Sequence, residues 1–337
     1  MKAAPSLKLA ALCAVAVVIA MSTANACAQT CQTSTDLDDA TRTSVTTAGQ
    51  RFFTWTSGGD VASLKQNAIA SLASDFGGVE NTIKAHQPEM TGAQPVLKGL
   101  FLLDEQGLAP DPHAEFYCGV FGKNGQTANS AAFYLDNLPP GKYGIVLFQA
   151  TTAKAVTNVS LILQAAGTDW KLGGLYIKPA QRAGHDSEWF LTQARAYKGK
   201  GQTHNAWLFC QEARNLISPL PFMGTLTTDR LFDECQSMQP TDFPVNGKNT
   251  DMALAGATYK INSVFLTVIG ADMDVGVWYQ VPDLSNTNLT YSSNMAVIRG
   301  LVTKYPELRD AFAGVEARAL DPNGRDYGTL LAMKDVK

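Results

Sequence analysis

Six short stretches between residues 96 and 178 constrain the fold more than any other feature of this sequence. Each is rich in aromatic and β-branched residues: "VLKGLFLLD", "AEFYCGVFG", "AAFYLDNL", "YGIVLFQAT", "AVTNVSLILQ" and "WKLGGLYIK". Turn-forming stretches such as "GKNGQ" and "LPPGK" separate them and are too short to hold helices. We therefore expect an antiparallel sheet of about four to six strands.

The last two stretches predict a hairpin with a turn at "AAGTD". Residues on one face of a strand recur at every second position. This rule places Val159, Leu161 and Leu163 on one face of the first strand, and Trp170, Leu172, Gly174 and Tyr176 on one face of the second. Adjacent glycines at 173 and 174 indicate a bend or close packing, and Pro179 ends the strand.

Helical patterns flank the strands on both sides. Before them, helices are expected over residues 37–56 and 60–86, with Asp60 as an N-cap, an interruption at Gly77–Gly78 and an end before Pro88. After Pro179, residues 186–238 predict a helical hairpin and a third helix capped by Thr227 or Thr228. A polar stretch over residues 239–256 then separates this region from a C-terminal unit.

The C-terminal unit, residues 257–337, reads as two strands, a helix over residues 290–304, and two further strands. This ββαββ order predicts a small four-stranded sheet with the helix on one face. The whole mature chain is therefore expected to be α+β, divided into residues 36–179, 186–238 and 257–337.

The N-terminus has the pattern of a secretory signal peptide over residues 1–26. Two lysines precede an apolar run, and Ala24-Asn25-Ala26 supplies an Ala-x-Ala cleavage site. The apolar run is shorter than a membrane span, and no comparable run follows. We expect a periplasmic or secreted protein without a transmembrane segment. Cleavage after residue 28 is an alternative, and so is a lipid anchor on Cys27.

The charge and the cysteines limit the kinds of partner and site that this chain can have. The chain has 30 acidic residues against 27 Lys and Arg and lacks a basic cluster, which argues against nucleic acid as a partner. In an oxidising compartment, Cys210 and Cys235 form the disulfide we favour, because both lie in predicted helices that can be neighbours. The cysteine spacings fit no zinc site, and Cys118 is expected to be a free cysteine and a small buried residue.

Two parts of the chain resemble known families. Helices containing "RFFTWTSGGDVASL", followed by a sheet ending in "VSLILQAAGTDWKLGGLYIKP", resemble the NTF2-like (cystatin-like α+β cone) superfamily over residues 36–179. Residues 187–219 are similar to one tetratricopeptide repeat at Ala194, Tyr197, Gly201, Ala206 and Ala213, but depart from it at Gln193. No second repeat follows, so a connector is expected.

The NTF2-like resemblance implies a cone that can hold an apolar ligand. Its possible lining residues are Tyr117, Tyr134, Asp136, Trp170 and Tyr176. Isomerase and cyclase members add an aspartate base and a tyrosine or acid donor. None of the five residues matches a catalytic motif of the superfamily, and fold alone does not assign a reaction.

Other candidate chemistry is weak. The four histidines form no metal-binding motif, and no serine lies in a nucleophile motif. Asp272 and Asp274 read as a solvated turn rather than a calcium loop. No metal or cofactor is expected. The sequence favours a non-enzymatic envelope protein that binds a small apolar ligand or a protein partner. The alternative is an isomerase, dehydratase or cyclase that uses the cone.

Overall fold

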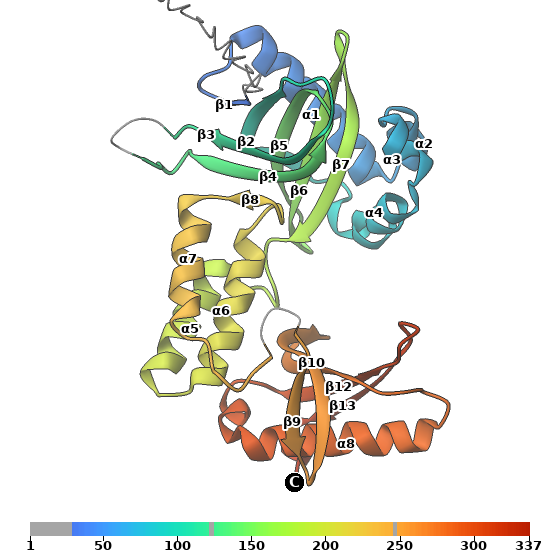
Figure 1. Cartoon of the computed structure of the whole chain (residues 1–337), viewed down its shortest axis with the longest axis vertical. Helices are drawn as coiled ribbons and strands as arrows, with labels where there is room; N and C mark the ends of the chain where they lie inside the picture. Colours follow the sequence, from blue (N-terminus) through green and yellow to red (C-terminus); the bar gives the residue numbers. More distant parts are fainter. Residues whose placement is uncertain (1–28, 121–124, 245–247) are drawn as a thin grey trace, which may run out of the picture.

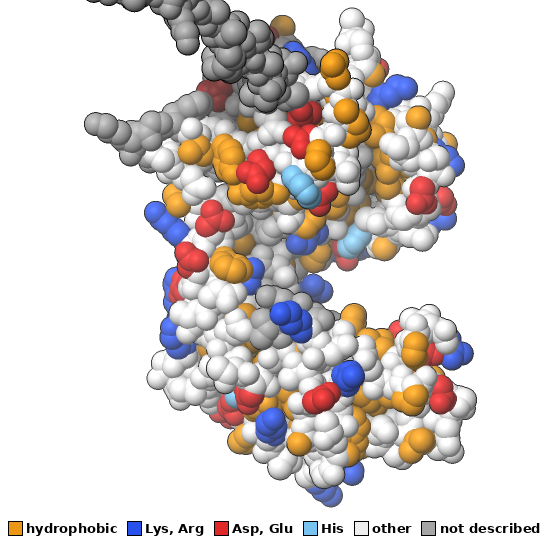
Figure 2. Space-filling view, viewed as in Figure 1, with side chains coloured by type: hydrophobic (Ala, Val, Ile, Leu, Met, Phe, Trp, Pro, Cys, Tyr) orange, Lys and Arg blue, Asp and Glu red, His pale blue; other side chains and the backbone are white. Residues whose placement is uncertain are grey.

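The structure, a computed structural model, describes residues 29–120, 125–244 and 248–337. The predicted signal peptide and Cys27 lie outside these ranges. The chain is α+β, as expected, and forms an N-terminal lobe and a C-terminal lobe, the second of which begins with helices α5–α7 (Figure 1). Figure 2 shows an open notch between the N-terminal lobe and the C-terminal sheet unit. No helix within the described ranges is long and apolar enough to cross a membrane.

Four helices begin the N-terminal lobe: α1 (Asp39–Gly58), α2 (Val61–Gln66), α3 (Ala70–Ser74) and α4 (Gly77–Met90). Asp60 caps α2 as predicted, accepting from the Ser63 amide. The predicted break at Gly77–Gly78 falls just before these glycines, at residues 75–76, where α3 ends and α4 begins. The predicted end before Pro88 is wrong, because α4 continues through Pro88 to Met90. A further break, which was not predicted, lies at residues 67–69, where the backbone hydrogen-bonds to both backbone groups of Leu172.

The six predicted strands are present as β2 (Gln94–Glu105), β3 (Asp111–Cys118), β4 (Ala131–Leu138), β5 (Gly141–Thr151), β6 (Val156–Ala166) and β7 (Asp169–Pro179). They do not form one sheet. The N-terminal sheet has the order β1-β2-β5-β6-β7, and the small sheet has the order β3-β4-β8. Strands β1 (Thr30–Thr33) and β8 (Met223–Gly224) escaped prediction because each is very short.

The N-terminal sheet is covered on both faces. Helices α1 and α4 lie over one face (Figure 1), and the core between them includes Phe52, Phe53 and Leu161, all almost fully buried. The small sheet packs on the opposite face through a second core that includes Phe116 and Phe133. The space that the resemblance assigns to a ligand is therefore lined by packed apolar side chains.

A β-bulge at Gly173 corrects the predicted faces of β7. Ile162 pairs with Gly174 and Leu163 pairs with Leu172, so Gly173 is an extra residue in the ladder. The bulge confirms that the two glycines mark a bend. It also reverses the alternation, so Trp170 belongs to the core under the helices while Tyr176 packs against the core under the small sheet.

Three helices follow the N-terminal lobe: α5 (Ser187–Gly199), α6 (Thr203–Ile217) and α7 (Leu226–Gln236). The first two form the expected helical hairpin. The predicted cap of α7 is wrong by two or three residues: Thr225 is the N-cap and exchanges hydrogen bonds with Thr228 in a capping box. The α6–α7 loop carries β8, which pairs with β4 of the N-terminal lobe.

The C-terminal unit contains β9 (Thr250–Leu254), β10 (Ala257–Ile269), β11 (Asp272–Gln280), α8 (Thr287–Lys304), β12 (Gly314–Leu320) and β13 (Asp326–Ala332), with short 3-10 helices η2 (Pro306–Asp310) and η3 (Met333–Asp335). Its sheet has five strands rather than the predicted four, because β9 lies in the stretch expected as a polar seam. Only β11 and β12 are parallel, and α8 connects them.

Helices α5–α7 share one hydrophobic core with the C-terminal unit. This core includes Phe190 and Phe209 from the helices, and Leu301 and Phe312 from the C-terminal unit. We therefore treat residues 186–337 as the C-terminal lobe and residues 29–180 as the N-terminal lobe. Helices α5–α7, which were expected to be a connector, therefore pack as part of the C-terminal lobe.

Candidate functional site

The five predicted pocket residues do not converge on one site. Tyr117 and Tyr134 lie about half exposed on the outer surface of the small sheet, with ring centroids 6.4 Å apart. The Tyr117 hydroxyl donates to Glu115, 2.6 Å away, and this hydrogen bond, with a smaller contribution from burial, raises the pKa of Tyr117 to about 12. Asp136, on the same sheet, faces His113 in an exposed pair.

The other two candidates are core residues. The Trp170 indole donates to the Ser44 hydroxyl, 3.0 Å away, and its ring is buried under the helices. Tyr176 packs edge-on against Phe222 on the opposite face of the N-terminal sheet. Placing Trp170 and Tyr176 together as lining residues was therefore wrong. The cause is the bulge at Gly173, which a pattern of alternate residues does not reveal.

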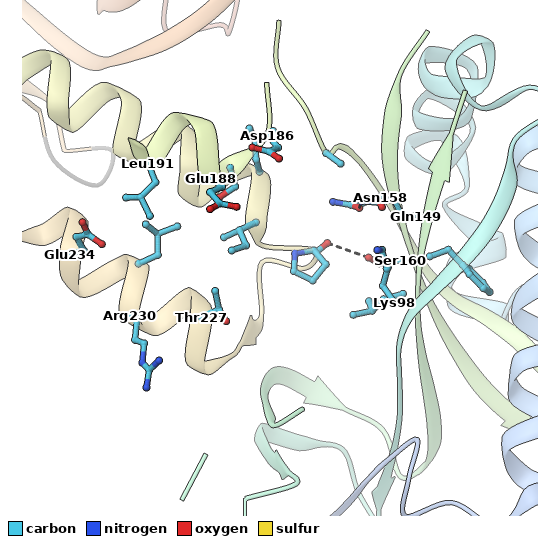
Figure 3. Close-up of a pocket in the computed structure, with 18 of the residues that line it drawn as sticks. Lys98, Gln149, Asn158, Ser160, Asp186, Glu188, Leu191, Thr227, Arg230 and Glu234 are labelled. Carbon is cyan, nitrogen blue, oxygen red and sulfur yellow. Dashed lines mark hydrogen bonds between the residues drawn. The ribbon is translucent and has the colours of Figure 1, made fainter. Parts of the chain in front are cut away.

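A large groove lies between the N-terminal sheet and helices α5–α7, and we call it the interlobe groove. Its volume is about 720 Å³, within the range of ligand pockets. Figure 3 shows Lys98, Gln149, Asn158 and Ser160 along the sheet wall. Glu188 and Leu191 of α5 and Arg230 of α7 lie on the helical side, where Leu191 points toward α7 and Arg230 points away from α5. Leu216, Ile217, Pro219 and Leu231 add an aliphatic surface on the helical wall.

The groove continues into a second cavity of about 430 Å³, which lies beside β2 and the turn after β1. The two cavities share Lys98, Leu147, Ile217, Pro219 and Thr227. They therefore form one elongated depression that passes from α5 to the end of β1. Its length suits an extended occupant better than a compact one.

The charges in the groove are only partly paired. Arg195 makes a bidentate ion pair with Glu234 across α5 and α7, at 2.6 and 2.7 Å, and the hydrogen bond lowers the pKa of Glu234. Lys98 and Arg230 also line the groove, and their side chains make no hydrogen bond or ion pair with another residue of the described ranges. Asp186 and Glu188 at the start of α5 also line the groove, so its lining carries three basic and three acidic side chains. The aliphatic wall suits a partly apolar occupant, and a negative charge on it would be placed beside Lys98 or Arg230.

Polar contacts hold the lobes at the ends of this groove. The Ser160 hydroxyl donates to the Pro219 carbonyl at 3.3 Å, the contact drawn in Figure 3. Lys178 donates to the Ser218 carbonyl at 3.1 Å, and burial lowers the pKa of its ammonium group. With the β4–β8 pairing, these contacts fix the loop between α6 and α7 against the N-terminal sheet.

His204 occupies a position that its sequence context did not reveal. Its Nδ1 lies 2.5 Å from Glu307 and its Nε2 lies 2.9 Å from Asp242, while its ring packs on Phe243 and Tyr305. The three polar residues come from α6, the loop before β9 and η2. This cluster joins α6 to the C-terminal unit and lies away from the groove residues.

The cysteines form two disulfides. Cys210 pairs with Cys235, which joins α6 to α7, and the Cα atoms lie 5.6 Å apart. The expectation of a free Cys118 was wrong: it pairs with Cys31 and joins β3 to β1. Their separation of 87 residues gave no local signal. Two disulfides indicate an oxidising compartment.

The turn at Asp272 and Asp274 was expected to be solvated, but Asp274 is buried. Asp274 is only 3 % exposed, and its Oδ2 has no hydrogen-bond partner in the part of the chain described. Among the described residues, no group of three or more His, Cys, Asp or Glu side chains is placed to hold a metal ion.

The comparisons with known proteins add no identity to this geometry. No protein-family model, curated protein or solved structure matches the chain.

Proposed function

We propose that this chain is an exported, non-enzymatic binding protein of the bacterial envelope, and that the interlobe groove is its binding site. The observation that carries this proposal is the groove itself: about 720 Å³ between two lobes, with an aliphatic wall and two unpaired cations. The two disulfides and the signal-like N-terminus support export.

The proposal keeps the NTF2-like assignment for residues 36–179, supported by helices that cover a sheet of antiparallel strands. It moves the binding site away from the cone to the opposite face of that sheet. No observation on the described residues favours the isomerase, dehydratase or cyclase alternative, since Tyr117, Tyr134 and Asp136 face outward. Trp170 and Tyr176 pack into cores on opposite faces of the sheet.

An apolar anionic dye tests the groove. 1-Anilinonaphthalene-8-sulfonate combines a fused aromatic ring with a sulfonate, which matches the aliphatic wall and the cations. We expect Leu191→Glu to weaken its Kd about tenfold or more, because the variant puts a like charge on the apolar wall; tenfold corresponds to about 1.4 kcal/mol. Fluorescence titration of the purified chain measures this change.

Leu289→Glu is the matched control, because Leu289 is 65 % exposed on α8 and does not line the groove. Its Kd should equal that of the parent chain. Equal dye affinity in the parent and the Leu191→Glu chain, with both folded by circular dichroism, would rule out the groove as the binding site.

A further inference from the structure

The edge of the N-terminal sheet is only half covered. Strand β1 is the outermost strand, and it pairs with β2 only from Phe101 to Asp104. The preceding part of β2, residues 94–100, pairs with β5 on one side. On the other side it has no strand partner among the described residues, which leaves backbone donors and acceptors open to an added strand.

This unpaired edge borders the elongated depression. Lys98 lines both cavities, and Gly99 and Leu100 line the one beside β1. Val96 and Leu97, at the start of the same edge, are 53 % and 40 % exposed although both are apolar. An extended chain lying here could pair with β2 and place alternate side chains against the shared groove residues Leu147 and Ile217.

The molecule already joins its lobes by the same kind of contact. Strand β8 comes from the loop between α6 and α7, yet it pairs with β4 of the N-terminal lobe through Met223 and Gly224. Met223 also lines the cavity beside β1. The depression therefore has a strand-to-strand contact near one wall and an unpaired strand along another.

Three features of the edge argue against a second copy of this chain as the occupant. Pro95 lacks an N–H group, a bulge interrupts the β2–β5 register between Leu97 and Gly99, and Lys98 is unpaired. Proline, lysine and bulges discourage pairing of an edge with any added strand, and a second copy would bring the same proline and bulge and place its own lysine, a like charge, near Lys98. A strand that carries an acidic residue opposite Lys98 avoids this repulsion and gains an ion pair.

From these observations we propose that the groove takes a short extended peptide segment of a partner protein, added as a strand to residues 94–100 of β2, with alternate apolar side chains facing the groove and an acidic side chain near Lys98. Main-chain hydrogen bonds would supply affinity and the groove would supply selectivity. This inference rests on the proposed function, because it names the chemical class of the groove's occupant.

Selection from phage-displayed random twelve-residue peptides tests the inference on the purified chain. We expect enriched peptides to alternate apolar residues and to carry Asp or Glu. N-methylation of alternate backbone nitrogens in a synthetic copy should weaken its Kd at least tenfold, because it removes strand hydrogen bonds. Hydrogen exchange should show new protection of amides within residues 94–100 on peptide binding.

Lys98→Glu should weaken the same peptide about threefold to tenfold, whereas Lys154→Glu, an exposed change on the β5–β6 turn, should leave its Kd unchanged. Unaltered binding after N-methylation, or protection confined to α5 and α7, would overturn strand addition. Failure to enrich any peptide would also overturn it. If the dye still binds in a Leu191-dependent manner, the proposed function stands without it.

Discussion

At the scale of single residues, two carboxylates are held in unfavourable surroundings. Asp274 and Glu105 are each 3 % exposed, and one oxygen of each lacks a hydrogen-bond partner among the described residues. Burial raises the pKa of both, and neighbouring acids add to the effect. For Asp274 these neighbours are Asp272 and Glu316. A raised pKa in the folded state means that ionisation costs stability.

We therefore expect Asp274→Asn to stabilise the C-terminal lobe at neutral pH. A carboxyl whose pKa is higher in the folded state than its unfolded value of about 3.9 binds more protons when folded. The free energy of unfolding therefore falls as the pH rises from the unfolded pKa through the folded pKa. The variant has no carboxyl at position 274, so it does not lose this stability as the pH rises. Its unfolding free energy at pH 7 should exceed that of the parent by on the order of 1 kcal/mol.

Urea unfolding at pH 4 and pH 7 measures this difference, which should be much smaller at pH 4. Asp233→Asn, an exposed change on α7, serves as the control and should alter stability by less than about 0.5 kcal/mol at either pH. A pH-independent effect of Asp274→Asn would show that ionisation of Asp274 is not its cause.

At the scale of elements, each disulfide fixes one pair of neighbours. The Cys31–Cys118 bond holds the four-residue strand β1 to β3 across a separation of 87 residues, and the Cys210–Cys235 bond holds α6 to α7 across 25. Strand β1 has only one neighbour in its sheet. The bond therefore secures the strand whose end defines where the free edge of β2 begins.

Loop-closure entropy predicts that the two disulfides contribute unequally. The chain-entropy relation gives about 4.6 kcal/mol for the longer loop and about 3.5 kcal/mol for the shorter one. Cys31→Ala with Cys118→Ala should therefore destabilise its lobe by about 1 kcal/mol more than Cys210→Ala with Cys235→Ala destabilises the other. Urea midpoints of the two double variants check this, and the reverse order would contradict the loop-length argument.

Local sequence predicted elements better than their arrangement. The helical period and the Asp60 cap located the start of α2, because these signals act within one turn. The break at residues 67–69 could not be predicted in the same way, since it depends on hydrogen bonds to Leu172, about a hundred positions away. The bulge at Gly173 shows the same limit: glycines suggested a bend, but only the ladder defined the extra residue.

At the scale of the whole molecule, the cores divide the chain into two lobes. The cores on the two faces of the N-terminal sheet draw nearly all their residues from the N-terminal lobe, with Leu220 and Met223 as additions from the α6–α7 loop. The third core lies entirely in residues 190–336. The lobes are joined by the β4–β8 pairing and a few polar contacts.

Separate cores predict two unfolding transitions rather than one. Trp55 and Trp170 lie in the N-terminal lobe, and Trp189, Trp207 and Trp278 lie in the C-terminal lobe. Hydrogen exchange in increasing urea should show the amides of each lobe opening together, at a midpoint different from that of the other lobe. Removal of one disulfide should move only its own lobe's midpoint. A single shared midpoint would show that the lobes unfold as one unit.

The sequence by itself determined the types of most elements, their order and the α+β class, because periodicity, caps and turn residues act between near neighbours. Tertiary structure alone decided which strands share a sheet, which cysteine pairs with Cys31, and that α5–α7 share a core with the C-terminal unit. It also created the groove. Each of these depends on contacts between residues distant in sequence, and a local pattern carries no information about such contacts.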